Sequence, residues 1–257
     1  MLIVAHRRPK TFDLTLRSLL RVAGVLPANV YVVQDGALAA VKTSATTHGI
    51  AERNFHQRAG PRGAVAKEKR IATHYKYALE WIFARVGADV PGVIVVEDDL
   101  LFAPDWMRYF RAVAPLLESD ETLISASAWN DNAFVHNVDR VAGAGELRRT
   151  TNFPGLSWLL PRALWKTQLS ASWPAEHWDH WMRDATTHRG RETLCPAISR
   201  VWHHGARGAN VSPQLQAAYF DPVALALDAA PWSAADVAGA ARAPYEKRLE
   251  ALLSGAK

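Results

Sequence analysis

Residues 93–105 read VIVVEDDLLFAPD, and this stretch decides how the rest of the chain is interpreted. Its first four residues are apolar and β-branched, which predicts a buried strand. Three carboxylates follow without a break, Glu97, Asp98 and Asp99. Because successive side chains of a strand point to opposite faces, the three are not expected to point the same way. Like charges held this close raise one another's pKa, so something must offset them.

Two interpretations of the acidic triplet follow from its chemistry. Unpaired carboxylates in a partly buried crevice would cost several kcal/mol, and a divalent cation would remove that penalty. Mg²⁺ and Mn²⁺ prefer oxygen ligands and often keep waters and a substrate phosphate in their shell, which suggests a metal–diphosphate site. The alternative is that the triplet begins a solvated loop and caps the helix after Pro104. The spacing of the acids alone does not choose between these two.

The segments around this stretch alternate between strand and helix patterns. Strands are predicted at 2–5, 30–34 and 123–129, and helices at 11–24, 67–87, 106–117 and 245–253. Strands that alternate with helices and end in polar residues are typical of a doubly wound α/β sheet, in which ligands bind beyond the carboxyl ends of the strands. Asp35, which follows the second strand, is therefore expected at the same edge of the sheet as the acidic triplet.

The composition fits one α/β domain and excludes several classes of protein. With 257 residues, 49% of them hydrophobic, the chain can bury one sizeable core. The formal net charge of +5 is spread along the chain, which gives little support to nucleic-acid binding and suits an anionic small ligand. Cys195 is the only cysteine, so an intramolecular disulfide and a multi-cysteine zinc site are excluded.

No segment of the sequence is predicted to cross a membrane. The apolar run LIVA at 2–5 is too short for the core of a signal peptide, and no other segment approaches ~20 uninterrupted apolar residues. The G-x-G-x-x-G dinucleotide fingerprint and the Walker A loop are also missing, because GAGELR at 143–148 lacks the final glycine. The chain as given is expected to be soluble.

Several uncommon strings occur in one order along the chain. They are VAHRRP (4–9), VVQDG (32–36), THYKYAL (73–79), VVEDDLLFAPDWMRYFR (95–111), SASAWNDN (125–132), TTNFPGLSWLL (150–160), WPAEHWDHWMR (173–183) and RGRETLCPAISR (189–200). Together they resemble the inverting N-acetylglucosaminyltransferases that include N-acetylglucosaminyltransferase I and the protein O-mannose β-1,2-N-acetylglucosaminyltransferase. The resemblance covers most of the chain and implies a GT-A glycosyltransferase fold with a Rossmann-like mixed sheet flanked by helices.

The resemblance also implies a donor site for UDP-N-acetylglucosamine and Mn²⁺, with Mg²⁺ as the alternative metal. In that family the last acid of the triplet ligates the metal that holds the diphosphate, and this position is Asp99 here. The two preceding acids, Glu97 and Asp98, would contact the donor's sugar and ribose. The arginine that serves the nucleotide matches Arg8, with Arg7 as a weaker match. Two further matches belong to uridine recognition, namely Asp35 and His74.

An inverting transferase needs a carboxylate that takes the proton of the attacking hydroxyl. In the family this base lies in a W-D-x-W-M-R string, which makes Asp179 the candidate catalytic base. A second acid follows the base in N-acetylglucosaminyltransferase I, whereas this chain has His180, which is the fallback base because a neutral imidazole can accept a proton. Four residues are expected to touch the sugar or the acceptor, namely Leu156, Trp178, Trp181 and Arg183.

Other conspicuous residues have simpler interpretations. Trp158 and Trp173 are expected in the core, and the NDN of SAWNDN is expected to form a turn through its own side chains. The pair His203 and His204 is interpreted as buried or loop histidines rather than as metal ligands. The glycine-containing stretch 205–214 is expected to be a loop that orders over bound nucleotide.

These observations combine into one prediction. The chain is a single GT-A catalytic domain, 1–257, with a nucleotide-binding half at about 1–120, an acceptor half at about 121–225 and a C-terminal helical segment at 226–257. It would transfer N-acetylglucosamine from UDP-GlcNAc to a mannose hydroxyl of a glycan or glycoconjugate, in β-1,2 linkage. The alternatives are a metal-dependent phosphohydrolase of nucleotide sugars and a non-catalytic nucleotide-sugar or glycan-binding protein. The location would be the cytoplasm for a full-length bacterial chain, or the Golgi lumen for an excised catalytic domain.

Overall fold

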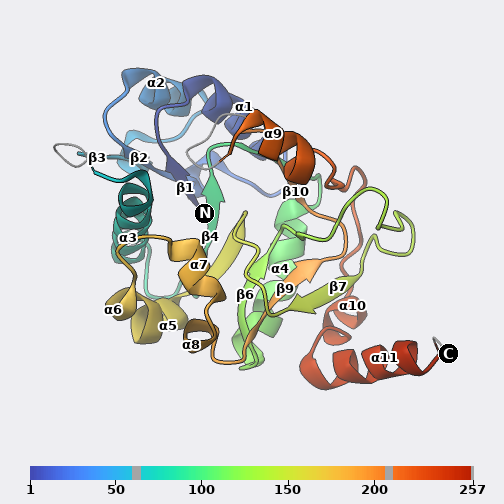
Figure 1. The fold of residues 1–257 in the computed structure, drawn as a ribbon. Coiled ribbons are helices and arrows are strands. Elements are labelled where there is room, and N and C mark those ends of the chain that lie inside the picture. The colour runs from blue at the N-terminus through green and yellow to red at the C-terminus, as the bar shows by residue number, and fades with distance from the viewer. Residues whose placement is uncertain (60–64, 206–210, 256–257) are drawn as a thin grey trace.

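The computed structural model describes residues 1–59, 65–205 and 211–255 (Figure 1). Within them an eight-stranded sheet has the order β3-β2-β1-β4-β8-β6-β9-β7, and a two-stranded sheet pairs β10 with β5. The strands are β1 (Leu2–Ala5), β2 (Tyr31–Asp35), β3 (Phe55–Arg58), β4 (Gly92–Glu97), β5 (Leu100–Phe102), β6 (Leu123–Ser127), β7 (Leu147–Thr150), β8 (Trp158–Pro161), β9 (Glu192–Pro196) and β10 (Val201–His203).

Helices connect most of these strands. They are α1 (Pro9–Leu19), α2 (Ala39–Thr47), α3 (Lys67–Arg85), α4 (Trp106–Ser119), α5 (Arg162–Leu164), α6 (Ser170–Ser172), α7 (Trp178–Arg183), α8 (Ala185–His188), α9 (Pro213–Leu215), α10 (Ala234–Ala238) and α11 (Arg242–Gly255). Short turns of other helix types are η1 (Pro27–Asn29), η2 (Glu52–Asn54), η3 (Trp165–Leu169) and η4 (Gln216–Phe220).

The large sheet is mixed. Parallel pairing joins β3, β2, β1 and β4, and also β6 with β9, whereas β8 and β7 run antiparallel to their neighbours. The carboxyl ends of the parallel strands therefore share one edge. The predicted fold class, an α/β protein with a Rossmann-like mixed sheet flanked by helices, is confirmed.

Helices cover both faces of the sheet because strand residues alternate between two cores. Ile3 belongs to a buried cluster with Phe12 of α1 and Phe110 of α4, whereas Leu2 belongs to another with Leu79 of α3. The period of two in the strands thus directs α1 and α4 to one face and α3 to the other. The helix patterns predicted from sequence at 67–87 and 106–117 correspond to α3 and α4.

The order of the sheet creates a switch point between β1 and β4. These strands are neighbours, yet the chain leaves β1 toward β2 on one side and reaches β4 only after β3. Loops after such neighbours diverge to opposite faces and leave a crevice at the carboxyl edge of the sheet. The loop after β1 carries Arg8, and the turn after β4 carries Asp98 and Asp99.

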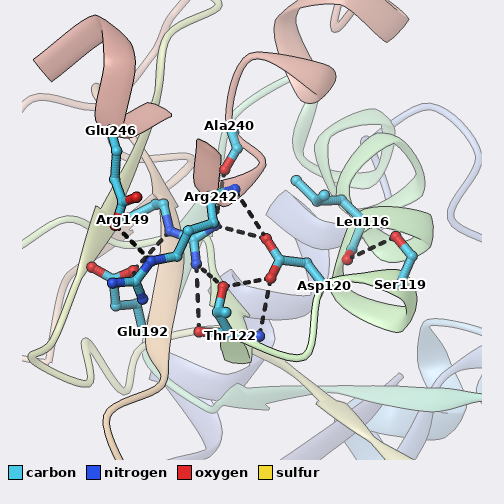
Figure 2. Close-up of polar contacts among 9 residues, drawn as sticks. All are labelled: Leu116, Ser119, Asp120, Thr122, Arg149, Glu192, Ala240, Arg242 and Glu246. Carbon is cyan, nitrogen blue, oxygen red and sulfur yellow. Dashed lines mark hydrogen bonds and ion pairs between the residues drawn. The ribbon is translucent and has the colours of Figure 1, made fainter. Parts of the chain in front are cut away.

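The C-terminal helical segment lies beside β7, at the side of the sheet opposite to β3 (Figure 1). Trp232, 5% exposed, donates its indole N–H to Asp105 at the start of α4, with Nε1 and Oδ2 2.7 Å apart. Figure 2 shows the second attachment, in which the buried Arg149 of β7 donates to Asp120, Glu192 and the carbonyl of Ala240. The segment is thus fixed to the sheet at two places.

The division of the chain at about residues 120 and 225 stays a prediction. Strands from both expected halves hydrogen-bond in one sheet, since β4 pairs with β8. Among the helices of the described residues, none combines the length and apolar character needed to span a membrane.

Candidate active site

The three acids of the triplet lie at the switch point, where Asp98 and Asp99 are nearly inaccessible to solvent and Glu97 is half-buried. Glu97 ends β4, and Asp98 and Asp99 form the turn before β5, with 2% and 3% exposure. Arg8 donates to both aspartates, with Nη1 2.6 Å from Asp99 Oδ2. Asp98 and Asp99 belong to a turn and not to a strand, so strand alternation does not separate their two side chains. One guanidinium can therefore contact both.

The triplet contains three carboxyl groups of different acidity. Burial alone would raise the pKa of Asp99, but hydrogen bonds from His203 and Arg8 and their charges lower it to about 2. Burial raises the pKa of Asp98 despite the charge of Arg8. Burial and the charge of Asp99 raise the pKa of Glu97 to about 7, although Tyr75 donates its hydroxyl to that carboxylate. Asp99 is the acid most firmly held as an anion.

Asp99 has unused capacity for a cation. Its Oδ2 accepts from Arg8, whereas Oδ1 is buried and has no hydrogen-bond partner among the described residues. Gly205 lies against this carboxylate, and a Cβ at that position would stand 2.2 Å from Asp99 Oδ2. A buried anionic oxygen without a partner fits a hard divalent ion, which prefers such ligands. Within the described residues no group of three or more His, Cys, Asp or Glu side chains is arranged to hold a metal.

The second part of the site follows β2. Asp35 is 3% exposed and pairs with Arg58 at 3.0 Å and Arg70 at 3.7 Å. His74 of α3 lies beside it, buried, with Nε2 3.2 Å from the carbonyl oxygen of Ala5. Burial lowers the pKa of His74 to about 4, so the ring is neutral at pH 7. Because a carbonyl only accepts, Nε2 carries the hydrogen, and the unpartnered Nδ1 is an acceptor.

The third part of the site is α7. Asp179 is held by Arg183 one turn later, whose Nη1 lies 3.0 Å from Oδ2, and its side chain is 38% exposed. His180 points away to solvent with 74% side-chain exposure, and its Nε2 stays 3.9 Å from Asp179. The helix is anchored by Trp178, which is 5% exposed and stacks on Tyr75 at 4.1 Å between ring centroids. The stacked rings of Trp178 and Tyr75 therefore hold in place the helix that carries Asp179.

These parts line one cleft of about 560 Å³. Of the predicted site residues, the cleft brings together Arg8, Asp35, His74, Glu97, Asp98, Asp99, Leu156, Trp178, Asp179 and Arg183. It does not include Trp181, which packs edge-to-face on Trp173 instead. His180 and Arg7 are likewise not part of the described lining.

The structure adds residues to the cleft that sequence reasoning missed. Tyr75 holds Glu97, and Arg70 lies beside Asp35, which also pairs with Arg58 outside the described lining. The string THYKYAL contains Tyr75 next to His74, but nothing in one sequence shows that its hydroxyl reaches a carboxylate. His203, interpreted as a buried or loop histidine, is buried and lies 3.2 Å from Asp99. Burial is one of the two environments predicted for His203, and its place beside the triplet was not predicted.

Trp158 and Trp173 are buried, as predicted. The side chain of Asn130 accepts the backbone N–H of Asn132, which forms the expected turn. The loop predicted to order over nucleotide, 205–214, includes residues 206–210, which lie outside the described residues.

The sequence model of the GNT-I family matches residues 1–257. The chain is 32% identical over 269 residues to an alpha-1,3-mannosyl-glycoprotein 2-beta-N-acetylglucosaminyltransferase from Arabidopsis thaliana. That alignment covers 100% of this chain and 58% of the relative, so the chain spans a little over half the length of this curated relative.

Solved structures that match share little sequence with the chain. A fragment of S. aureus TarS matches with a TM-score of 0.49 and 11% identity, over 80% of this chain and 60% of that one. The mannosyltransferase PcManGT from Pyrobaculum calidifontis, in complex with GDP-Man and Mn²⁺, matches with a TM-score of 0.46 and 16% identity, over 77% and 57%.

Proposed function

Because the chain belongs to the GNT-I family, we propose that it is an inverting, metal-dependent glycosyltransferase that uses UDP-GlcNAc. The acceptor in this proposal is a mannose hydroxyl and the new linkage is β-1,2. The Arabidopsis relative carries a mannosyl acceptor and a 2-beta linkage in its name, which supports this choice. The metal is Mn²⁺, with Mg²⁺ as the alternative.

One observation carries the proposal. The predicted site residues, which are up to 175 positions apart in the sequence, from Arg8 to Arg183, line a single cleft at the carboxyl edge of the sheet. The acidic triplet and Arg8 meet there with the neutral His74. The half-exposed carboxylate of Asp179 stands apart from them in the same cleft. One cavity thus has room for the diphosphate and the nucleobase of a donor, and it also contains a carboxylate that can accept a proton.

The donor side follows from the hydrogen-bonding capacity of each group. Asp99 would hold the divalent ion, which when bound neutralises charge on the diphosphate and stabilises it as a leaving group. Arg8 donates one N–H from Nη1 to Asp99 and one from Nη2 to Asp98. The guanidinium has five N–H groups, so the others are left for phosphate oxygens. His74 Nδ1 is an acceptor that suits the N3–H of uracil, and Asp35 positions the neighbouring arginines.

In the transfer step, Asp179 is the general base. The acceptor hydroxyl oxygen forms a bond to the anomeric carbon as the bond from that carbon to the UDP oxygen breaks, and the electron pair leaves with UDP. The proton of the hydroxyl passes to the Asp179 carboxylate. Arg183 orients that carboxylate, and the stacked Trp178 and Tyr75 fix the helix that bears it. Attack opposite the leaving group converts the α-linked donor into a β-linked product.

The proposal is tested by incubating the protein with UDP-GlcNAc, Mn²⁺ and a set of alkyl mannosides. Mass spectrometry should detect a product larger by one N-acetylhexosamine, and the coupling constant of its new anomeric proton should report a β linkage. Release of UDP and free sugar at the same rate with and without acceptor would instead indicate a nucleotide-sugar hydrolase. Donor binding without turnover on any acceptor would favour a binding protein.

A further inference from the structure

Asp131 lines the same cleft as the candidate base and has no part in the donor site described above. It lies in the loop after β6, where the turn is formed by its neighbour Asn130. The Asn130 side chain accepts the backbone N–H of Asn132 and donates to the carbonyls of Pro196 and Ala197. The carboxylate of Asp131 takes no part in these hydrogen bonds, so the fold of the loop does not explain why an acid stands there.

Two neighbouring side chains fix the orientation of the Asp131 carboxylate. Trp129 donates its indole N–H to Oδ1, with Nε1 and Oδ1 2.8 Å apart, and Asn152 donates its side-chain amide to Oδ2 at 2.7 Å. An ionised carboxylate has about four acceptor positions, so each oxygen can accept a further hydrogen bond. Asp131 is exposed, whereas Trp129 is buried behind it at 3% exposure. The carboxylate is therefore oriented in advance for donors that enter the cleft.

A series of hydrogen bonds connects Asp131 with the candidate base. Asn152, which holds Asp131, is followed in the chain by Phe153, and the Phe153 carbonyl accepts Nε of Arg183 at 3.1 Å. The same guanidinium holds Asp179, with Nη1 3.0 Å from Oδ2. The loop between β7 and β8 thus connects the two carboxylates. Both therefore belong to the acceptor side of the cleft, apart from the acidic triplet.

Apolar side chains line the cleft together with these carboxylates. Leu156 comes from the loop that carries Asn152, and Phe220 of η4 lies beside Trp129, with ring centroids 5.9 Å apart. Leu156 and Phe220 are half-buried, so part of each side chain faces solvent. A sugar ring has apolar C–H groups on its faces and hydroxyls around its edge. Ligand sites that combine apolar walls with a few oriented polar groups suit such a molecule.

We propose that Asp131 determines acceptor specificity by accepting hydrogen bonds from two neighbouring hydroxyls of the acceptor sugar, one on each carboxylate oxygen. This inference rests on the proposed function, because it takes the acceptor to be a mannoside whose O2 is activated by Asp179. In that sugar the hydroxyls at C3 and C4 are adjacent and both equatorial, and the one at C3 is next to O2. Asp131 therefore holds O3 and O4, while the proton of the O2 hydroxyl passes to Asp179.

The test removes single hydroxyls from the acceptor, because a change in the sugar leaves the protein intact. Methyl α-mannoside and its 3-deoxy, 4-deoxy and 6-deoxy analogues are compared with UDP-GlcNAc and Mn²⁺ present. In wild type, kcat/KM should fall roughly 10–100-fold for the 3-deoxy and 4-deoxy sugars, the usual contribution of a hydrogen bond to a charged group, and stay close to the parent for the 6-deoxy sugar. In Asp131→Ala the four sugars should react alike. Glu176→Ala changes an exposed acid before α7, outside the described lining, and should keep the wild-type pattern.

Binding measurements separate this inference from the proposed function. Saturation-transfer NMR detects methyl α-mannoside on the full chain loaded with Mn²⁺ and UDP, and it needs no turnover. Mannoside binding that is lost in Asp131→Ala, in a protein that transfers no sugar, would support the subsite and remove the transferase activity. Sugar transfer in which wild type and Asp131→Ala treat the deoxy sugars alike would do the reverse. No mannoside binding to wild type would also overturn the subsite, and unchanged UDP affinity in Asp131→Ala should show that the variant is folded.

Discussion

At the scale of single residues, Asp179 and His180 offer the sharpest comparison, because they are neighbours with different surroundings. Asp179 lines the cleft, and His180 does not. Asp179→Asn should lower turnover by roughly 10²–10⁴-fold, the usual contribution of a general base, while UDP binding stays unchanged. His180→Asn should leave turnover close to wild type. Steady-state rates and UDP titration of both variants check this, and a larger loss in His180→Asn would move the base to the histidine.

Gly205 tests the packing around Asp99. A methyl group at this position would stand 2.2 Å from Asp99 Oδ2 and 3.0 Å from Arg8 Nη1, so both side chains must shift. Gly205→Ala should weaken metal-dependent UDP binding while the melting temperature changes little. Gly239→Ala is the control, because its Cβ would meet only ordinary contacts at 3.5 Å. Unchanged UDP affinity in Gly205→Ala would show that the carboxylate tolerates displacement.

His74 gives a prediction on pH. Its pKa falls from 6.5 in the unfolded chain to about 4 in the buried site, so the unfolded state binds more protons between these values. Stability from this group is complete above pH 6.5 and is lost as the pH falls toward 4. Between pH 7 and pH 5 the loss is ~2 kcal/mol. Urea unfolding of wild type and His74→Gln in EDTA should show a steeper pH dependence for wild type, and equal slopes would contradict the assignment.

Which site residues could be predicted depends on how local their signals are. Asp35 and the acidic triplet each follow a predicted strand, so the alternation of strands and helices is enough to expect them at one edge, whereas Arg8 was identified through the family resemblance. Tyr75 and His203 act through contacts with residues 22 and more than 100 positions away, which no pattern in one sequence encodes. Their roles require the packing of α3 and the pairing of β10.

At the scale of elements, the strands and helices with a local sequence signal were predicted, and those that depend on distant partners were not. The strands β1, β2, β4 and β6 were predicted from short runs rich in apolar residues, and the helices α3 and α4 from apolar residues at helical spacing. By contrast, β5 and β7 are short, and β5 continues directly from the acidic turn, so neither strand was predicted. Their strand character comes from partners distant in sequence, since β5 pairs with β10 and β7 with β9. Pairing of this kind depends on tertiary context and not on local propensity.

The attachment of α11 to the sheet gives a prediction on stability. Arg149 has a side chain with 0% exposure, and Figure 2 shows it bridging Asp120, Glu192 and the carbonyl of Ala240 just before α11. Arg149→Met removes the buried cation that joins two part-buried carboxylates and a carbonyl, which should cost ~3 kcal/mol in unfolding free energy. Arg148→Ala, on the same strand and 48% exposed, should stay within about 0.5 kcal/mol. Equal effects in urea unfolding would contradict a structural role for Arg149.

At the scale of the whole molecule, the order of the strands explains why the site lies where it does. The neighbours β1 and β4 send their connections in different directions, and the crevice between them receives the acidic turn and Arg8. The antiparallel β8 then brings the loop of Leu156 to the same edge, and α7 follows with Asp179. The cleft therefore joins residues from both expected halves of the chain, which is what a reaction between a donor and an acceptor requires.

The most direct test of the central claim is calorimetric titration of UDP-GlcNAc into three proteins, each with Mn²⁺ and with EDTA. They are wild type, Asp99→Ala, and Asp89→Ala as the control, an exposed acid before β4 at the opposite edge of the sheet. We expect binding with Mn²⁺ in wild type and Asp89→Ala, and its loss in EDTA and in Asp99→Ala. Binding that survives EDTA, or no binding under any condition, would contradict a metal-dependent donor site at the acidic turn.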